Sequence, residues 1–263
     1  MNKSHNHPFH MVDKSIWPLI TSMSIFNMAF NLIIWFNTNE NWNIFLIMLI
    51  MTLSSMYMWW KDVINESTFQ GCHTSFSNKN MRMGMMLFIV SEIFFFLSFF
   101  WAYFHMALSP SIEIGAMWPP KGILLINPYK IPLLNTLLLV SSGFTITWSH
   151  YSLINSLKNE SILSLSITIN LGLIFSMIQI YEYIMCPFTM SDSVFGSIFF
   201  MMTGFHGIHV MVGTIFLIVC LIRMYKNHYS FYQHLSFEMA SWYWHFVDVV
   251  WLFLYIFIYW WIF

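Results

Sequence analysis

The sequence has very little charge. Only 8% of its 263 residues are Asp, Glu, Lys or Arg, whereas 58% are apolar and 20% are aromatic. Roughly a quarter of the residues of a soluble domain are charged, so this composition excludes an ordinary water-soluble globule. Lys and Arg (10) nearly balance Asp and Glu (11), and the net charge of −1 gives no electrostatic basis for binding nucleic acid. We therefore expect lipid to be the main solvent of this chain.

Cysteine is also scarce, and targeting signals are missing. Cys72, Cys186 and Cys220 are far apart, which excludes a disulfide framework and a CxxC metal site. The first 15 residues contain neither the apolar core of a secretory signal nor any Arg, so we expect the mature chain to begin at Met1. There is no fixed-period repeat and no low-complexity linker, which favours a single membrane domain over residues 1–263.

Long apolar segments fill most of the chain. A helix needs about 20 apolar residues to cross the hydrocarbon core of a bilayer. Polar interruptions predict an all-α polytopic membrane protein with seven spans, at 16–36, 42–60, 83–105, 131–151, 162–185, 195–222 and 237–263. The first two spans form a helical hairpin, and the polar stretch 61–80 connects them to the third.

The basic residues are distributed unequally between the two sides of these spans. Loops on the side from which a membrane protein is inserted are enriched in Lys and Arg, so the positions of these residues indicate the orientation of the chain. Eight of them fall on the side of the N-terminus (Lys3, Lys14, Lys61, Lys79, Arg82, Lys158, Arg223 and Lys226), and only Lys121 and Lys130 fall on the other. The N-terminus is predicted inside and the C-terminus outside.

Small residues recur at helical spacing on two spans. Lipid tails are as apolar as Leu, so membrane helices associate through small residues and buried polar groups. We therefore predict close-contact faces on the third span (Gly84, Ser91, Ser98 and Ala102) and on the sixth (Gly196, Thr203, Gly207 and Thr214).

Glu92 is the clearest ionisable residue inside the predicted bilayer. It lies in the segment FIVSEIFFF of the third span, too deep for a short side chain to reach the headgroups. An unpaired charge there costs at least a few kcal/mol and usually has a function. One interpretation is a proton-handling or lipid-facing carboxyl, and the other is a neutral acid hydrogen-bonded to another helix.

Histidines provide two further polar sets. His206 and His209 are three residues apart on the sixth span, a spacing that can hold a metal. No further ligands of matching type accompany them, which favours hydrogen-bonded histidines of the helix bundle and no metal site. On the seventh span, His245 and Asp248 are one turn apart, and we expect each to satisfy the other or a neighbouring helix.

A third set lies at the predicted inner interface. Cations beside tryptophan at this depth suit anionic lipid phosphates, although each cation also serves topology alone. The set consists of Trp59 and Trp60 at the end of the second span, Lys61, Asp62, Glu66 and His73 after it, and Arg223, Lys226 and His228 after the sixth.

Nine segments in a fixed order carry a family resemblance. They are HPFHMVD (7–13), WWKDVI (59–64), ESTFQG (66–71), SEIFFF (91–96), FFWA (99–102), WPP (118–120), PLLNT (132–136), GFHGIHV (204–210) and WYWHFVDVVW (242–251). Nearly end to end, the chain resembles subunit III of the mitochondrial haem-copper cytochrome c oxidases.

The resemblance implies a non-redox core subunit of a proton-pumping respiratory oxidase in the mitochondrial inner membrane. It implies a first helix pair separated from the other five helices by a V-shaped cleft filled with phospholipid. The N-terminus would face the matrix and the C-terminus the intermembrane space. The subunit itself would have no catalytic residue, haem or copper, because haem a and copper belong to the partner subunits I and II. Its role would be to support proton uptake and the stability of the catalytic subunit, with smaller accessory subunits as further partners.

The resemblance also implies residue roles. Glu92 matches a membrane-buried reactive carboxyl, and Trp60, Glu66, His73, Arg223, Lys226 and His228 match positions around lipid headgroups. Asn65 and Cys72 depart from the family pattern, in which a basic residue and a second histidine are usual, so one phosphate contact is affected. The alternative function is an independent transporter or proton channel with Glu92, His206, His209 and Asp248 as a relay. Such proteins usually show internal duplication or broken helices, which this sequence does not.

Overall fold

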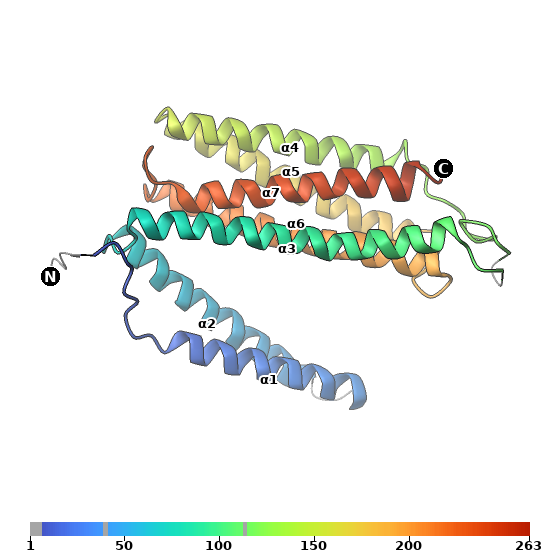
Figure 1. Ribbon diagram of the computed structural model, residues 1–263, viewed down its shortest axis with the longest axis horizontal. Coiled ribbons are helices and arrows are strands. Elements are labelled where there is room, and N and C mark those ends of the chain that lie inside the picture. The colour runs from blue at the N-terminus through green and yellow to red at the C-terminus, as the bar shows by residue number, and fades with distance from the viewer. Residues whose placement is uncertain (1–6, 39–41, 113–114) are drawn as a thin grey trace. The chain divides into compact units, whose positions relative to one another are not determined.

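The computed structural model describes residues 7–38, 42–112 and 115–263, and the regular structure in these residues is helical. The helices in chain order are α1 (Trp17–Thr38), α2 (Trp42–Thr68), α3 (Ser75–Leu108), α4 (Ile131–Ile154), α5 (Lys158–Met185), α6 (Val194–Tyr225) and α7 (Leu235–Leu254), with the π-helical turn η2 (Tyr255–Trp260) continuing α7 (Figure 1). Within these described residues, seven helical segments are long and apolar enough to cross a membrane. The predicted all-α, seven-span fold is confirmed.

The helices extend further than the apolar segments. Residues 61–80 were predicted to be a polar connection, but α2 continues to Thr68 and α3 begins at Ser75, leaving only 69–74 outside the helices. The prediction was wrong because it ended each helix where apolar residues end. Backbone hydrogen bonding sustains a helix beyond that point wherever polar side chains can reach headgroups or water.

The chain divides into two compact units, Met1–Met81 and Arg82–Phe263. In the first unit α1 packs against α2 as the expected hairpin. The buried residues at this contact are small and polar: Thr21 and Ser24 on α1, and Thr52 and Ser55 on α2. The hydroxyls of Ser24 and Ser55 are 3.4 Å apart. Such residues let two backbones approach closely in lipid. The single membrane domain and the lipid-filled cleft stay predictions.

Trp244 of α7 holds the second unit together. Its side chain is fully buried, and its indole Nε1 donates to Ser142 Oγ of α4 at 2.8 Å. A methyl group on Gly172 of α5 would lie 2.7 Å from the indole, and one on Gly213 of α6 would lie 3.0 Å from it. The ring therefore fits only because two neighbouring helices have glycine at these positions, and one side chain links α4, α5, α6 and α7.

Helix α3 joins this unit through large side chains. Tyr103 Oη donates to the Phe257 carbonyl at 2.8 Å, and Phe96 packs edge-on against Phe246. Within the second unit, the predicted small-residue face of α3 does not contact another helix, because Gly84, Ser91, Ser98 and Ala102 are all exposed. The hydroxyls of Ser91 and Ser98 bond to carbonyls of their own helix, so they require no partner helix.

The corresponding prediction for α6 is correct at two of its four positions. Thr203 accepts a hydrogen bond from Tyr183 of α5, and Thr214 lies beside Gly172 of α5. Gly196 is buried against the Thr189 carbonyl before α6, and Gly207 has no neighbouring atom within 4 Å of where a methyl group would be added.

Candidate functional site

Glu92 of α3 pairs with His209 of α6. Glu92 Oε2 lies 2.9 Å from His209 Nε2, and the two side chains are only 20% and 13% exposed. The residues are 117 positions apart in the sequence. An acid deep in the third span therefore finds a hydrogen-bond partner on another helix, as its cost in an apolar environment requires.

The hydrogen bonds of His209 fix the number of protons on this pair. Its Nδ1 lies 2.7 Å from the Phe205 carbonyl oxygen, which can only accept, so Nδ1 carries a hydrogen. The remaining nitrogen and the Glu92 carboxyl then share one further proton, as acid with neutral imidazole or as carboxylate with imidazolium. Both forms have zero net charge, so the pair as a whole avoids the cost of an isolated charge in lipid.

Aromatic rings surround the His209 imidazole. Phe96 meets it edge-on with ring centroids 5.1 Å apart, and Tyr243 lies nearly parallel to it at 6.3 Å. Phe95 and Phe246 complete the surround at 6.3 and 6.4 Å. These apolar neighbours reduce the access of water to the Glu92–His209 hydrogen bond and strengthen it electrostatically.

His206 has a different partner from His209. Its side chain is buried, and Nε2 donates to the Val247 carbonyl of α7 at 3.2 Å. Its ring packs against Phe175 and Trp251. The two histidines lie on the same helix but have different hydrogen-bond partners. In the part of the chain that the structure describes, neither belongs to a group of three side chains that could hold a metal ion.

His245 and Asp248 lie one turn apart on α7 but do not form a hydrogen bond. Their closest atoms, His245 Nδ1 and Asp248 Oδ2, are 4.0 Å apart. Within the described residues, Asp248 Oδ1 is buried without a hydrogen-bond partner, and Asp248 Oδ2 faces Gly143 of α4. We expected each of these two side chains to hydrogen-bond the other or a neighbouring helix. At this distance they form at most a weak ion pair with each other.

The predicted headgroup residues fall in both units. In the first unit, Trp59 and Trp60 are 37% and 56% exposed near the end of the apolar part of α2. Trp17 of α1 donates to Asp62 at 2.8 Å, which links the same end of the hairpin. Glu66 and His73 lie beside His10.

In the second unit, the headgroup residues follow the end of α6. The Arg223 guanidinium donates to Ser236 and lies 4.8 Å from the centre of the Tyr229 ring, whereas Lys226 is exposed. Burial, together with the nearby positive charges of Arg223 and Lys226, lowers the pKa of His228 below its ordinary 6.5. His228 is therefore mostly uncharged at neutral pH, and the positive charge of this set comes from Arg223 and Lys226.

Comparison with known proteins decides the family. The model of the family "Cytochrome c oxidase subunit III" matches residues 7–263. The chain belongs to the cytochrome c oxidase subunit III family.

Relatives agree over almost the whole chain. The chain is 53% identical over 261 residues to cytochrome c oxidase subunit 3 of Aedes aegypti, with 99% of each chain covered. It is 52% identical to the subunit 3 of Drosophila yakuba over 99% of each chain, and 52% identical to that of Pisaster ochraceus over 98% of this chain and 99% of the relative. This chain is thus a multi-pass inner-membrane subunit of the oxidoreductase complex cytochrome c oxidase.

Several polar contacts of this subunit III chain were missed by the sequence analysis. Tyr259 donates to the buried Glu182 of α5 at 2.6 Å, and Asn135 donates to Gln179 at 3.3 Å. The signal for Glu182 was present, since an acid within the apolar fifth span is the same kind of feature as Glu92.

Two other missed contacts had no signal in the sequence. Arg82 holds Glu238 through two hydrogen bonds of 2.9 and 3.1 Å, and His10 lies beside Glu66 and His73. Both contacts join residues that are far apart in the sequence, so neither could have been predicted from spacing.

Proposed function

We propose that this chain supports proton uptake by the oxidase and keeps the catalytic subunit stable during turnover, without a redox centre of its own. The Glu92–His209 pair carries this proposal. It holds one shareable proton at membrane depth, and its other hydrogen bond, from His209 Nδ1 to the Phe205 carbonyl, stays within α6. A closed pair of this kind suits local proton storage and helix positioning. Haem a and copper would be held by the partner subunits I and II.

The relay required by an independent proton channel or transporter is not supported. His206 donates to the Val247 backbone, and Asp248 lies 4.0 Å from His245. In the described residues, no hydrogen bond connects Glu92 or His209 to His206 or Asp248. Proton transfer along a chain requires such connections or intervening water, so the four residues do not form a continuous path.

Phospholipid binding is the second part of the proposal. Trp59, Trp60, Glu66 and His73 in the first unit, and Arg223, Lys226 and His228 in the second, form two candidate headgroup sets. Tryptophans are favoured at the headgroup level, and basic side chains beyond the apolar part of a helix attract anionic phosphate. Arg223 is held in place by Ser236 and the Tyr229 ring, which prepares its guanidinium for a fixed phosphate.

The proposed setting in the membrane follows from the distribution of basic residues. Eight of the ten Lys and Arg residues lie on the N-terminal side of the spans, which supports an N-terminus on the matrix side and a C-terminus in the intermembrane space. Subunits I and II and the smaller accessory subunits are the proposed protein partners.

Replacing Glu92 tests the proposed supporting role. In the purified oxidase, Glu92→Ala should leave the haem spectra and the initial rate of oxygen reduction close to those of the parent, while activity declines faster during sustained turnover. Glu92→Gln, which can still donate to a neutral His209, should decline more slowly than Glu92→Ala. Glu160→Ala removes an exposed acid of α5 and serves as the control. Turnover as durable in Glu92→Ala as in the control would refute the proposed role.

The headgroup proposal has its own test. Combined Arg223→Ala and Lys226→Ala substitutions should reduce the anionic phospholipid that copurifies with the complex, as measured by mass spectrometry. Combined Lys121→Ala and Lys130→Ala substitutions remove the same number of positive charges from exposed residues on the opposite side of the predicted membrane, and serve as the matched control. Undiminished anionic lipid in the double variant would count against this site.

A further inference from the structure

The segment before α1 is attached to the segment that joins α2 to α3. The Thr74 hydroxyl donates to the Pro8 carbonyl, and the ring of Phe9 meets Phe76 edge-on with centroids 5.7 Å apart. The contacts join the two residues just before His10 to residues just after His73, so they bring the two histidines next to each other. All of these residues belong to the first unit.

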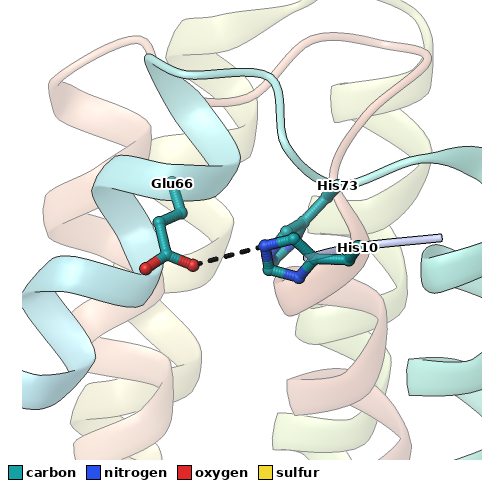
Figure 2. A group of neighbouring side chains, drawn as sticks. All are labelled: His10, Glu66 and His73. Carbon is teal, nitrogen blue, oxygen red and sulfur yellow. Dashed lines mark ion pairs between the residues drawn. The ribbon is translucent and has the colours of Figure 1, made fainter. Parts of the chain in front are cut away.

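The last part of α2 brings an acid to the same place. His10 Nε2 lies 3.5 Å from Glu66 Oε2, and the rings of His10 and His73 have centroids 5.1 Å apart. One ligand atom from each of His10, Glu66 and His73 lies within 4.8 Å of the others. Figure 2 shows the His10 imidazole facing the Glu66 carboxylate with His73 beside it.

Backbone hydrogen bonds fix the spacing between Glu66 and His73. Gln70 N donates to the Asn65 carbonyl at 3.2 Å, and Cys72 N donates to the Glu66 carbonyl at 3.1 Å. The connection therefore folds back on the end of α2 and returns His73 toward Glu66. The Cys72 thiol lies 3.7 Å from the Gln70 side-chain oxygen, so this sulfur is directed to Gln70 and is not part of the ligand group.

The geometry points to a binding site for a divalent transition-metal ion, with zinc as the best match, formed by His10, Glu66 and His73. Two imidazoles and one carboxylate are a known zinc ligand set, in which the fourth position is open to water or another ligand. Ligands about 2.0–2.1 Å from a tetrahedral ion are separated by about 3.3–3.4 Å. The His10–Glu66 separation of 3.5 Å already matches that spacing, and His73 requires only a small side-chain shift.

Burial at this site is suited to a metal ion. The side chains of His10 and Glu66 are 16% and 19% exposed, which shields the ligands from bulk water but leaves a path for the ion. A dication bound to one carboxylate and two neutral imidazoles leaves a net positive charge. The site would therefore attract an anion in its fourth position, and the proposal holds whether or not phospholipid is the anion.

A second group of three side chains offers a useful comparison. His150, His234 and Glu238 in the second unit also place one ligand atom each within 4.8 Å of the others. There, however, the Arg82 guanidinium already pairs with both oxygens of Glu238, at 2.9 and 3.1 Å. This positive charge occupies the carboxylate and would repel a metal ion, so the observations favour the His10 group.

Zinc binding to the intact oxidase tests the proposal directly. Purified complex is equilibrated with Zn²⁺ by dialysis, and bound zinc is measured across a range of free zinc concentrations. His10→Ala, Glu66→Gln and His73→Ala should each weaken one class of sites by about 100-fold or more, because loss of an outer-shell partner alone weakens metal binding 10–100-fold. His105→Ala removes an exposed histidine of α3 and should leave every class of sites unchanged.

Two further measurements keep the result decisive. Haem spectra and subunit composition of each variant should match the parent, which separates loss of a ligand from loss of assembly. Acidification should weaken zinc binding at this site, because protons compete with the metal for imidazole nitrogens. Zinc affinity unchanged in all three correctly assembled variants, or zinc affinity that rises on acidification, would overturn the proposal.

Discussion

Glu92 and His209 lie 2.9 Å apart on helices α3 and α6, and the Phe205 carbonyl fixes a hydrogen on the other nitrogen of the His209 ring. The two residues are thus the two ends of one hydrogen bond that contains a single shared proton. An acid that looks isolated in the sequence is part of a neutral pair in the folded chain. This relationship changes what substitutions at either position should do.

Removal of His209 should destabilise the complex more than a neutral replacement of Glu92. His209→Ala leaves the Glu92 carboxyl without its partner, and an unsatisfied buried group costs about 1–3 kcal/mol. Glu92→Gln keeps a donor for His209 Nε2 and should cost less than half as much. Thermal unfolding of the purified complex measures both effects. The double variant His209→Ala, Glu92→Leu should recover part of the lost stability, and purely additive effects would show that the pair is not coupled.

Methyl groups next to Trp244 should destabilise the second unit. Gly172→Ala and Gly213→Ala each add an atom 2.7 or 3.0 Å from the indole, and overpacking of this kind costs about 1–3 kcal/mol. Gly207→Ala is the matched control on α6, since nothing lies within 4 Å of the added methyl group. The melting temperature of the complex should fall for the first two variants only. An equal change in all three would mean that intrinsic helix propensity and not packing is responsible.

Glu182 should depend on the hydroxyl of Tyr259. Glu182 is 2% exposed, and Tyr259 donates to it at 2.6 Å. Tyr259→Phe removes this donor from a buried acid and should destabilise the complex by about 1–3 kcal/mol. Tyr255→Phe, whose hydroxyl lies 3.5 Å from the Pro128 carbonyl, should have little effect. Thermal unfolding of the two variants in parallel shows whether the Tyr259–Glu182 hydrogen bond is responsible, or whether loss of any tyrosine hydroxyl from η2 lowers the stability.

Binding of anionic lipid near the end of α6 should depend on pH through His228. Its pKa is lowered by burial and by Arg223 and Lys226, so the imidazole gains its proton only below the ordinary value of 6.5. At about pH 7, His228→Ala should therefore retain as much anionic lipid as the parent. Below the lowered pKa the parent gains a positive charge and should retain more lipid, whereas the variant should not. Mass spectrometry of copurified lipid, from about pH 7 to below this pKa, shows whether lipid retention rises as the pH falls. An equal rise in His228→Ala would assign the titration to another group.

Much of the fold could be predicted from the sequence because it depends on local composition. Seven apolar segments of sufficient length were enough to predict the spans, and the polar break at 37–41 predicted the hairpin of α1 and α2. The helix ends at Thr68 and Ser75 were missed, since backbone hydrogen bonding continues past the last apolar residue. The predicted contact face of α3 is not used within the second unit. Ser91 and Ser98 satisfy their hydroxyls within their own helix, and spacing alone does not show this.

The sequence by itself determined that the chain spans a membrane, how often it does so, its family resemblance, and that Glu92 lies well inside an apolar segment. Tertiary structure alone decided which side chains meet. It paired Glu92 with His209, separated the partner of His206 from that of His209, placed Trp244 against two glycines, and brought His10 to Glu66. The physical reason is the range of the forces involved. Partition into lipid depends on the apolar content of about 20 consecutive residues, whereas a hydrogen bond or a packed ring depends on distances of a few ångströms between helices that are far apart in the chain.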